Sequence, residues 1–362
     1  MRERGNLFFH KFDRYVGIPL VFLAGVRVKR KLPKKIERIA ILKSAGIGDL
    51  VVMSGIIHDM RTAFPDAKIT LFTGQANRAM GELIEGVEVI ALPIMKPWLA
   101  AKKIREQSFD VWIDGDPWPR ISALLSRCSR AKFRIGFRTP GQCRHFAYDI
   151  AIEHSAEEHE VENLRRLVMP LGVISLSLPK LNIEEPKKKM VVLHQFPGGS
   201  RAALKMWDKW QPLADYLVKK GYRVVTTGGK ADHSMLRGVE NHAGKDSLLE
   251  TCKLLSSAFC VITVDTGVMH LSGALSTFTL ALHGPTSPKR WGALGKNVVA
   301  LTPNIDYTPC IHLGFEATCK TSRCMRAITL QQVIEVFENE ERKDKSASAS
   351  RRERDEALAH LP

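Results

Sequence analysis

The stretch ILKSAGIGDLVVMSG, residues 41–55, joins one apolar run to a second through a turn that contains Gly46 and Gly48. The two glycines permit a tight connection between a strand and a helix. The third glycine of the dinucleotide-binding fingerprint and the lysine of a P-loop are both missing, so the turn alone specifies no ligand. Asp49 has two interpretations: a cap of the following helix, or a carboxylate that faces a cleft and accepts a proton from a hydroxyl group.

Similar short β-branched runs alternate with helical patterns through residues 36–183: RIAILK, KITLFTG, VEVIAL, DVWIDGD and RIGF. This alternation is typical of parallel strands joined by crossover helices. A charged segment with a proline, residues 184–189, is a predicted linker. The pattern starts again in residues 190–341 with MVVLHQFPGG, RVVTTGG, CVITVDTG, TLALHGPTSP and VVALTP. The sequence therefore predicts two Rossmann-like α/β domains with a cleft along the carboxyl ends of their strands.

The N-terminal segment is strongly basic. The 362 residues carry a formal charge of +16, and residues 1–35 hold ten Lys or Arg against Glu3 and Asp13. Such a cluster attracts phosphates, either of a nucleic acid or of an anionic lipid surface. The uncharged run at residues 15–26 is too short to span a bilayer core of about 30 Å. We expect a basic amphipathic extension that either packs on the fold or lies on the inner face of the cytoplasmic membrane.

The cysteines and the C-terminal tail add two further expectations. Seven scattered cysteines and no visible export signal favour the cytoplasm. Residues 342–362 are polar and charged, which predicts a mobile tail or a lone surface helix.

Two patterns resemble metal sites, and we interpret both as structural. The segment 310–324 lacks the Cys-x-x-Cys spacing of a zinc site, although it contains His312 and three thiols, Cys310, Cys319 and Cys324. In WIDGDPW, Asp114 and Asp116 have the spacing of an Asp-x-Asp motif, but they belong to the first domain, away from the expected phosphate site. We therefore predict no metal ligand.

Phosphate-binding groups are expected in the second half. FPGGSRAALKMW brings the backbone of a glycine loop together with three side chains, Ser200, Arg201 and Lys205. In VITVDTGVMHL a strand ends at Asp265, and the helix that follows offers free amides to an anion near Thr266 and Gly267. His270 shares one helix face with Thr266. The alternative interpretation is structural: the glycine segment is a polar loop, Asp265 and Thr266 are helix caps, and His270 is a core histidine. Two further strand ends carry the glycines Gly228 and Gly284.

Four motifs, KSAGIGDLVVMSG, GGSRAALKMW, VDTGVMHLSGAL and GPTSPKRWG, occur in this order, and over residues 36–340 the chain resembles the heptosyltransferases that transfer ADP-heptose in lipopolysaccharide core synthesis. The resemblance implies a GT-B fold, an acceptor domain before a nucleotide-sugar domain, and inversion at the anomeric carbon without a required metal or other cofactor. It places Asp49 at the position of the general base. It places the donor-binding motifs at Ser200, Lys205, Asp265, Thr266, Gly267 and His270.

Acceptor binding is less specified by the sequence. A basic cluster could meet phosphates of a lipid-linked oligosaccharide, or could be a solvated face: Arg120, Arg134 and Arg138. His159 lies near a histidine of the family, and its role is left open. Two alternatives to heptose transfer remain. One is a GT-B enzyme with another nucleotide-sugar or a protein acceptor, and the other is a non-catalytic nucleotide- or nucleic-acid-binding protein. The second gives no reason for Asp49, so we expect no nucleic acid partner.

Overall fold

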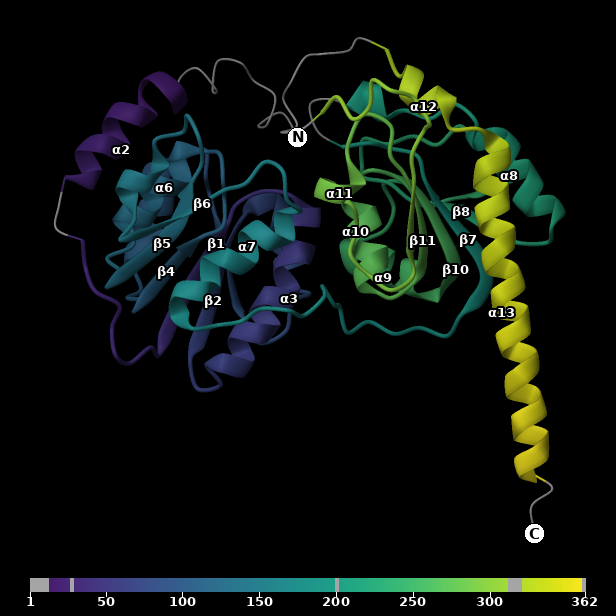
Figure 1. Cartoon of the computed structure of the whole chain (residues 1–362), viewed down its shortest axis with the longest axis horizontal. Coiled ribbons are helices and arrows are strands. Elements are labelled where there is room, and N and C mark those ends of the chain that lie inside the picture. The colour runs from purple at the N-terminus through teal and green to yellow at the C-terminus, as the bar shows by residue number, and fades with distance from the viewer. Residues whose placement is uncertain (1–12, 27–28, 199–201, 312–320, 360–362) are drawn as a thin grey trace.

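The computed structural model describes residues 13–26, 29–198, 202–311 and 321–359. Within these residues the chain forms two six-stranded sheets in which every pairing is parallel. Helices cover both sheets, and the two sheets lie side by side in Figure 1. The predicted α/β architecture of two Rossmann-like units is confirmed.

The first sheet has the strand order β3-β2-β1-β4-β5-β6. Its strands are β1 Arg38–Lys43, β2 Lys68–Gly74, β3 Glu88–Leu92, β4 Val111–Asp114, β5 Phe133–Arg138 and β6 Ile150–Glu153. Its helices are α3 Ile47–Ala63, α4 Arg78–Gly81, α5 Pro97–Arg105, α6 Arg120–Cys128 and α7 Glu160–Val168. The strand order reverses between β1 and β4, where ligands of such sheets bind. The turn after β1 carries Asp49.

The second sheet has the order β12-β11-β10-β7-β8-β9 and reverses between β7 and β10. Its strands are β7 Lys188–His194, β8 Arg223–Thr226, β9 Glu240–Asn241, β10 Ala258–Val264, β11 Phe278–Leu282 and β12 Val298–Leu301. Its helices are α8 Trp210–Lys219, α9 Leu248–Ser257, α10 Gly267–Ala274, α11 Pro288–Trp291, α12 Arg323–Ala327 and α13 Leu330–Ala359. Because β7 begins at Lys188, the predicted linker ends two residues too late.

The two halves meet through helices α3 and α10, which pack against each other. Buried apolar side chains of both helices, among them Ile56 and Leu271, belong to one continuous core. The first turns of the two helices are in contact, since a Cβ atom at residue 267 would lie 3.2 Å from Cβ of Ile47. The helix starts that follow β1 and β10 are therefore neighbours. The places where the strand order reverses in the two sheets thus lie close to each other.

The N-terminal segment folds into helix α2, Gly17–Gly25, which packs on α6 and on the short helix η2, Arg144–Ala147 (Figure 1). Val21 is fully buried in this contact, and Gly25 lies against Phe146. The described part of the extension thus packs on the fold, one of the two expected alternatives, and membrane binding is still a prediction; residues 1–12 and 27–28 lie outside the described part. In and beside α2 several apolar side chains are exposed, namely Tyr15, Leu20, Phe22, Leu23 and Val26, although Phe22 also contacts Phe146.

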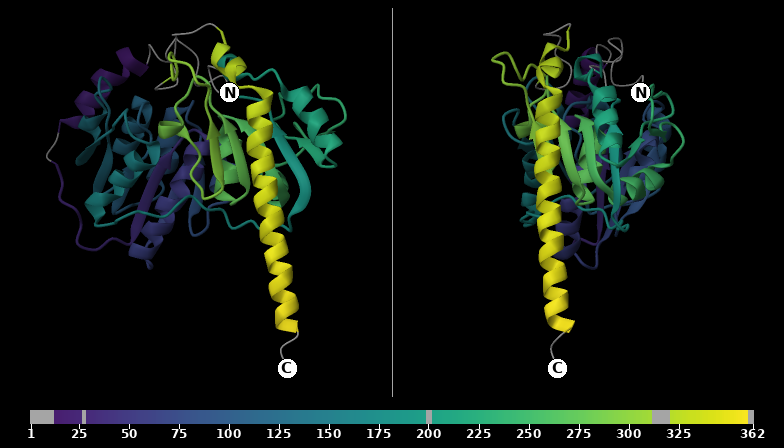
Figure 2. Two further views of the ribbon diagram at one scale, coloured as in Figure 1. Left: turned by 45° about the vertical axis from the view of Figure 1, so that its right-hand side comes forward. Right: turned by 90° about the vertical axis from the view of Figure 1, so that its right-hand side faces the viewer.

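The C-terminal tail is helical. Helix α13 buries Val333 and Phe337 near its start and continues to Ala359, so the tail is helical through residue 359, as the second of the two expected alternatives has it. Figure 2 shows this helix running past the rest of the molecule in both views. Among the described residues no helix combines the length and the apolar character needed to cross a membrane.

Candidate functional site

Asp49 lies in the first turn of α3. The helix begins at Ile47 and its N-cap is Gly46, so the interpretation of Asp49 as the cap is wrong. Gly46 has a φ of 89°, and a Cβ atom there would lie 2.4 Å from Oδ2 of Asp49. Any other residue would combine a strained backbone with a collision. The absence of a side chain at Gly46 therefore gives space to the Asp49 carboxylate. This carboxylate lies at the positive end of the dipole of α3.

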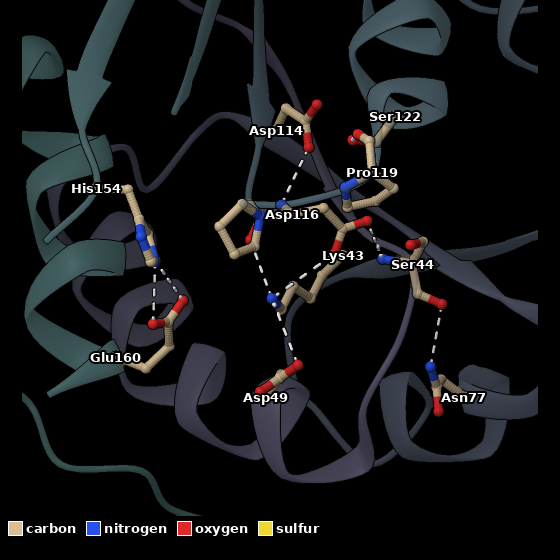
Figure 3. A network of polar contacts seen from close by, with 12 residues as sticks. Lys43, Ser44, Asp49, Asn77, Asp114, Asp116, Pro119, Ser122, His154 and Glu160 are labelled. Atoms are coloured by element: carbon tan, nitrogen blue, oxygen red, sulfur yellow. Dashed lines mark hydrogen bonds and ion pairs between the residues drawn. The ribbon is translucent and has the colours of Figure 1, made fainter. Parts of the chain in front are cut away.

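Lys43, the last residue of β1, lies beside this carboxylate (Figure 3). Its Nζ atom is 3.6 Å from Oδ2 of Asp49 and 3.7 Å from Oδ1 of Asp116, and it donates a 3.0 Å hydrogen bond to the Gly115 carbonyl. The Lys43 side chain is only 2% exposed, whereas that of Asp49 is 23% exposed. Our sequence analysis missed Lys43. The signal was a lysine at the end of an otherwise buried strand, directly before the glycine turn.

The two aspartates of WIDGDPW have different environments. Asp114 is buried and accepts hydrogen bonds from Arg144 (2.8 Å), from the Tyr148 hydroxyl (2.6 Å) and from the Asp116 amide (3.0 Å). Burial raises the pKa of Asp114, against the opposing charge of Arg144. Asp116 instead accepts from the Ser44 amide at 3.0 Å and faces Lys43. The structural interpretation is thus correct for Asp114, while Asp116 belongs to the surroundings of Asp49.

On the second sheet, Lys205 and Asp265 form a close ion pair. The Lys205 ammonium is 2.7 Å from Oδ2 of Asp265, and their side chains are 16% and 10% exposed. Burial alone would raise the pKa of Asp265, but the charges of Lys205 and His283 hold this pKa below its usual range. Thr266 is the N-cap of α10, and its hydroxyl accepts from the Val268 amide at 3.2 Å. Three predicted donor-binding residues therefore converge at one helix start.

His270, on α10, lies against the turn that precedes Asp49 on α3. A Cβ atom at residue 48 would lie 2.5 Å from Cδ2 of His270, so Gly48 makes room for this ring. Burial lowers the pKa of His270 to about 4, although the carboxylates of Asp265 and Asp49 act in the opposite direction. Its Nδ1 atom is buried and has no hydrogen-bond partner within the described part of the chain. His270 is therefore neutral at pH 7 and is not a satisfied core histidine.

Three glycines assigned to donor binding allow close packing. A Cβ atom at residue 284 would lie 2.4 Å from Sδ of Met325, and one at residue 228 would lie 2.8 Å from Cδ2 of Phe196. Gly267 makes the contact with Ile47 described above. The remaining donor-binding candidates, Ser200 and Arg201, lie outside the described residues.

Two of the three acceptor arginines are internal, which corrects the sequence-based assignment. Arg120 is buried and pairs with Asp13 at 2.8 Å, so it fastens the N-terminal segment to α6. Arg134 is also buried, and its Nε donates to the Ser126 carbonyl at 2.8 Å. Arg138 is on the surface and lies 3.5 Å from Glu153. Only Arg138 presents its guanidinium to solvent.

His159 bridges the two halves. It caps α7 by accepting from the Val161 amide at its Nδ1 atom (3.0 Å), and its Nε2 atom lies 2.9 Å from the Gly292 carbonyl. Since a carbonyl only accepts, Nε2 carries the proton and the ring is neutral; burial lowers its pKa accordingly. Arg290, buried as well, donates to the Ala156 carbonyl across the same boundary.

The two parallel α/β sheets, with acid and lysine side chains at the strand ends next to α3 and α10, form a GT-B fold. The E. coli heptosyltransferase WaaC with ADP superimposes with a TM-score of 0.69 at 20% identity, covering 84% of this chain and 99% of that one.

The family follows from the sequence comparisons. The model of glycosyltransferase family 9 (heptosyltransferase) matches residues 98–320, and the chain belongs to this family. Lipopolysaccharide heptosyltransferase 1 of Salmonella typhimurium is 34% identical over 300 residues, which are 73% of this chain and 93% of the relative. The predicted family and the prediction of a glycosyltransferase are confirmed, and a non-catalytic binding protein is excluded.

The expectation of no metal is still a prediction. The fold is shared with TibC of enterotoxigenic E. coli H10407, described as an iron-containing dodecameric glycosyltransferase (TM-score 0.58, 18% identity, 86% of this chain and 77% of that one). Within residues that the structure describes, no three His, Cys, Asp or Glu side chains are grouped to hold a metal ion. Cys319 and His312 fall outside those residues.

Proposed function

We propose that this enzyme transfers heptose from ADP-heptose to a lipopolysaccharide core-type acceptor, with inversion at the anomeric carbon. The observation that carries the proposal is the position of Asp49, a partly exposed carboxylate whose helix start touches the start of α10 and its donor motif. The names of the relatives support the substrates: one is a lipopolysaccharide heptosyltransferase and another was solved with ADP. In this proposal the first sheet holds the acceptor and the second holds the nucleotide-sugar.

The chemistry needs one base and a site for the leaving diphosphate. Asp49 accepts the proton of the acceptor hydroxyl while its oxygen attacks the anomeric carbon, and ADP departs from the opposite face. No covalent sugar intermediate is required, so a single carboxylate is sufficient. The Lys205 ammonium and the amides at the start of α10 stabilise the charge that develops on the diphosphate, by about 3 kcal/mol for a well-placed donor. Asp265 holds Lys205 in place through their ion pair.

The test is a transfer assay with purified protein. ADP-heptose and deacylated core oligosaccharide without terminal heptose should give a glycosylated product, and UDP-sugars and GDP-sugars should give little. NMR of the product should show an anomeric configuration opposite to that of the donor. Equal transfer from a UDP- or GDP-sugar, or retention of configuration, would contradict the proposal.

We also propose that α2 places the enzyme on the inner face of the cytoplasmic membrane. The exposed face of α2 carries Leu20 and Leu23, which are 46% and 67% exposed, and the basic stretch 29–35 follows it. Apolar side chains on a short helix next to lysines suit an interface with anionic lipid. Because α2 is also packed on α6, deletion of residues 1–35 would remove the buried Val21 and the partner of Arg120, and would not test membrane binding alone.

Point substitutions on the exposed face avoid this difficulty. The double variant Leu20→Ser with Leu23→Ser should keep its thermal stability and bind phosphatidylglycerol vesicles about 10³-fold more weakly, since each buried leucine contributes about 2 kcal/mol and each 1.4 kcal/mol is a factor of about ten. A matched pair on the segment after α7, Ile174→Ser with Leu176→Ser, removes apolar groups that are even more exposed and should bind like the wild type. Unchanged binding by the α2 variant would show that α2 is only a structural helix.

A further inference from the structure

Lys43 and Asp116 reach Asp49 through the register of the first sheet. Strands β1 and β4 are neighbours in which Leu42 is opposite Asp114, so the residues after each strand lie next to each other. The Gly115 amide donates to the Leu42 carbonyl at 2.8 Å and continues the pairing past the end of β4. The buried side chain of Lys43 then points along the strand ends toward the turn that carries Asp49 (Figure 3).

The three side chains form a charge triad of one ammonium and two carboxylates. Nζ of Lys43 is 3.6 Å from Asp49 and 3.7 Å from Asp116, nearly equal distances that exceed those of a strong hydrogen bond. Lys43 therefore acts on both acids mainly through its charge, which is weakly screened in a buried position. Asp116 is fixed by the Ser44 amide, so the ammonium is shared and neither acid neutralises it alone.

The other ionisable groups near Asp49 carry little net charge toward it. On α10, His270 is neutral at pH 7 because burial lowers its pKa to about 4. At the start of α7, His159 is held neutral by its two hydrogen bonds, and Glu160 faces His154 at 3.1 Å. On α4, Arg78 is paired with Glu82. Of the charged groups with described positions, Lys43 and Asp116 are those for which the structure gives a direct ion-pair geometry with Asp49 or with its lysine.

We infer that Lys43 is a positioning residue that keeps Asp49 ionised and directed at the acceptor, and that Asp116, by sharing the same ammonium, keeps Asp49 basic enough to take a proton. The inference rests on the proposed role of Asp49 as the base. An ammonium bound to Asp49 alone would make a weak base, and a missing ammonium would leave the base protonated at higher pH. The two neighbours thus act on Asp49 in opposite directions.

The test compares the pH dependence of kcat/KM for three variants. In Lys43→Gln the acid limb should move upward by about one pH unit or more, as expected for loss of an opposite charge within about 4–6 Å. In Asp116→Asn it should move downward, because a neighbouring negative charge is removed and Lys43 acts on Asp49 alone. Lys43→Arg retains the charge and should restore the wild-type acid limb.

A second lysine serves as the matched control for a purely structural effect. Lys187, just before β7, donates to the carbonyls of Ser256 (2.8 Å) and Ala258 (3.0 Å), at the amino ends of the two central strands of the other sheet. Lys187→Gln should lower thermal stability without moving the acid limb. Variants of Lys43 or Asp116 that lose activity evenly at every pH, or that shift the limb in the same direction, would overturn the inference.

A measurement without substrate separates this inference from the proposed reaction. In protein labelled with ¹³C at aspartate carboxyl groups, the resonance that disappears in Asp49→Asn reports the titration of Asp49 directly. Its midpoint should rise in Lys43→Gln and fall in Asp116→Asn. If wild-type protein transferred no heptose, the proposed function would fail while this titration would still decide the role of Lys43. Identical midpoints in all variants would refute that role.

Discussion

The corner after β1 and the corner after β10 are built from the same two residue types. Each places an aspartate at a helix start and a lysine beside it, at the reversal of strand order in its own sheet. In the second corner Lys205 and Asp265 are 2.7 Å apart, and the ammonium holds the pKa of Asp265 low. In the first, Lys43 lies 3.6 Å from Asp49 and is shared with Asp116, and Asp49 is more than twice as exposed as Asp265.

The comparison shows that distance and sharing decide what an acid beside a lysine can do. A close pair fixes both charges and makes a rigid support for a ligand. A more distant, shared ammonium orients its carboxylate and suits the proposed proton transfer. Asp265 is accordingly suited to hold Lys205, and Asp49 is suited to react.

The largest effect should come from Asp49→Asn, which removes the proposed base and keeps the size of the side chain. Transfer should fall by about 10²–10⁴-fold, the usual contribution of a general base, while calorimetric affinity for ADP stays the same. Asp59→Asn, on the same helix but bonded to Ser175 and Ser177, should transfer at the wild-type rate. If Asp49→Asn retained turnover within a few-fold of wild type, Asp49 would not be the base, and the difference between the two corners would not be related to catalysis.

Lys205→Ala should produce the next largest effect, on the donor side alone. Loss of one cationic donor should slow transfer by about 10²-fold and weaken ADP binding, with acceptor affinity nearly unchanged. The control is Lys209→Ala, which removes a lysine paired with Asp208 near the start of α8. Calorimetry and initial rates that leave both ADP affinity and turnover unaltered would remove Lys205 from the donor site.

The strand ends of the second sheet also carry buried histidines, and this predicts a smaller effect on stability in acid. His194 donates from Nδ1 to the Thr227 carbonyl at 2.9 Å, and burial lowers its pKa. Its folded pKa is below the unfolded value of about 6.5, so the unfolded chain binds more protons and stability falls as pH decreases from there. In His194→Asn, which can keep the donor, the fall in unfolding free energy should be shallower by about 1.4 kcal/mol per pH unit.

Urea unfolding between about pH 5 and pH 6.5 measures this slope. The exposed His58 on α3 supplies the control, since His58→Asn should leave the slope unchanged. If the slope of unfolding free energy against pH were the same in His194→Asn and in the wild type, His194 would not contribute to the loss of stability in acid.

Metal removal should have the smallest effect. Both corners balance their acids with lysines, and the helix amides with Lys205 supply positive charge for the diphosphate. We therefore expect unchanged transfer after dialysis against EDTA, with the metal content of the dialysed protein checked by elemental analysis. Loss of transfer that added iron or magnesium restores would show that the lysines alone are insufficient.

The fold could be predicted because its signals are local. Short β-branched runs that alternate with helices specify parallel sheets wherever they occur, and Asp265 and Thr266 follow a strand in which the pattern is unmistakable. Lys205 could be assigned to the same place because loops after neighbouring parallel strands meet at one edge.

The errors concern residues whose partners are distant in sequence. Lys43 and Asp116 are 73 residues apart, and only the pairing of β1 with β4 joins them. Arg120 resembled a surface cation because its partner, Asp13, is 107 residues away in the N-terminal segment. Composition identifies an arginine but does not show whether an internal carboxylate already binds it.

The contact between α3 and α10 places the proposed site at the junction of the two halves. If one sheet turned relative to the other about this contact, each atom would move in proportion to its distance from the contact. Ile47 and Gly267 touch at that point, and Asp49 and Thr266 are within two residues of them, so their separation would change least. The outer rims of the sheets would move farthest. Such a rotation would change the spacing of the rims while the proposed base, Asp49, kept its distance from the donor motif at Thr266.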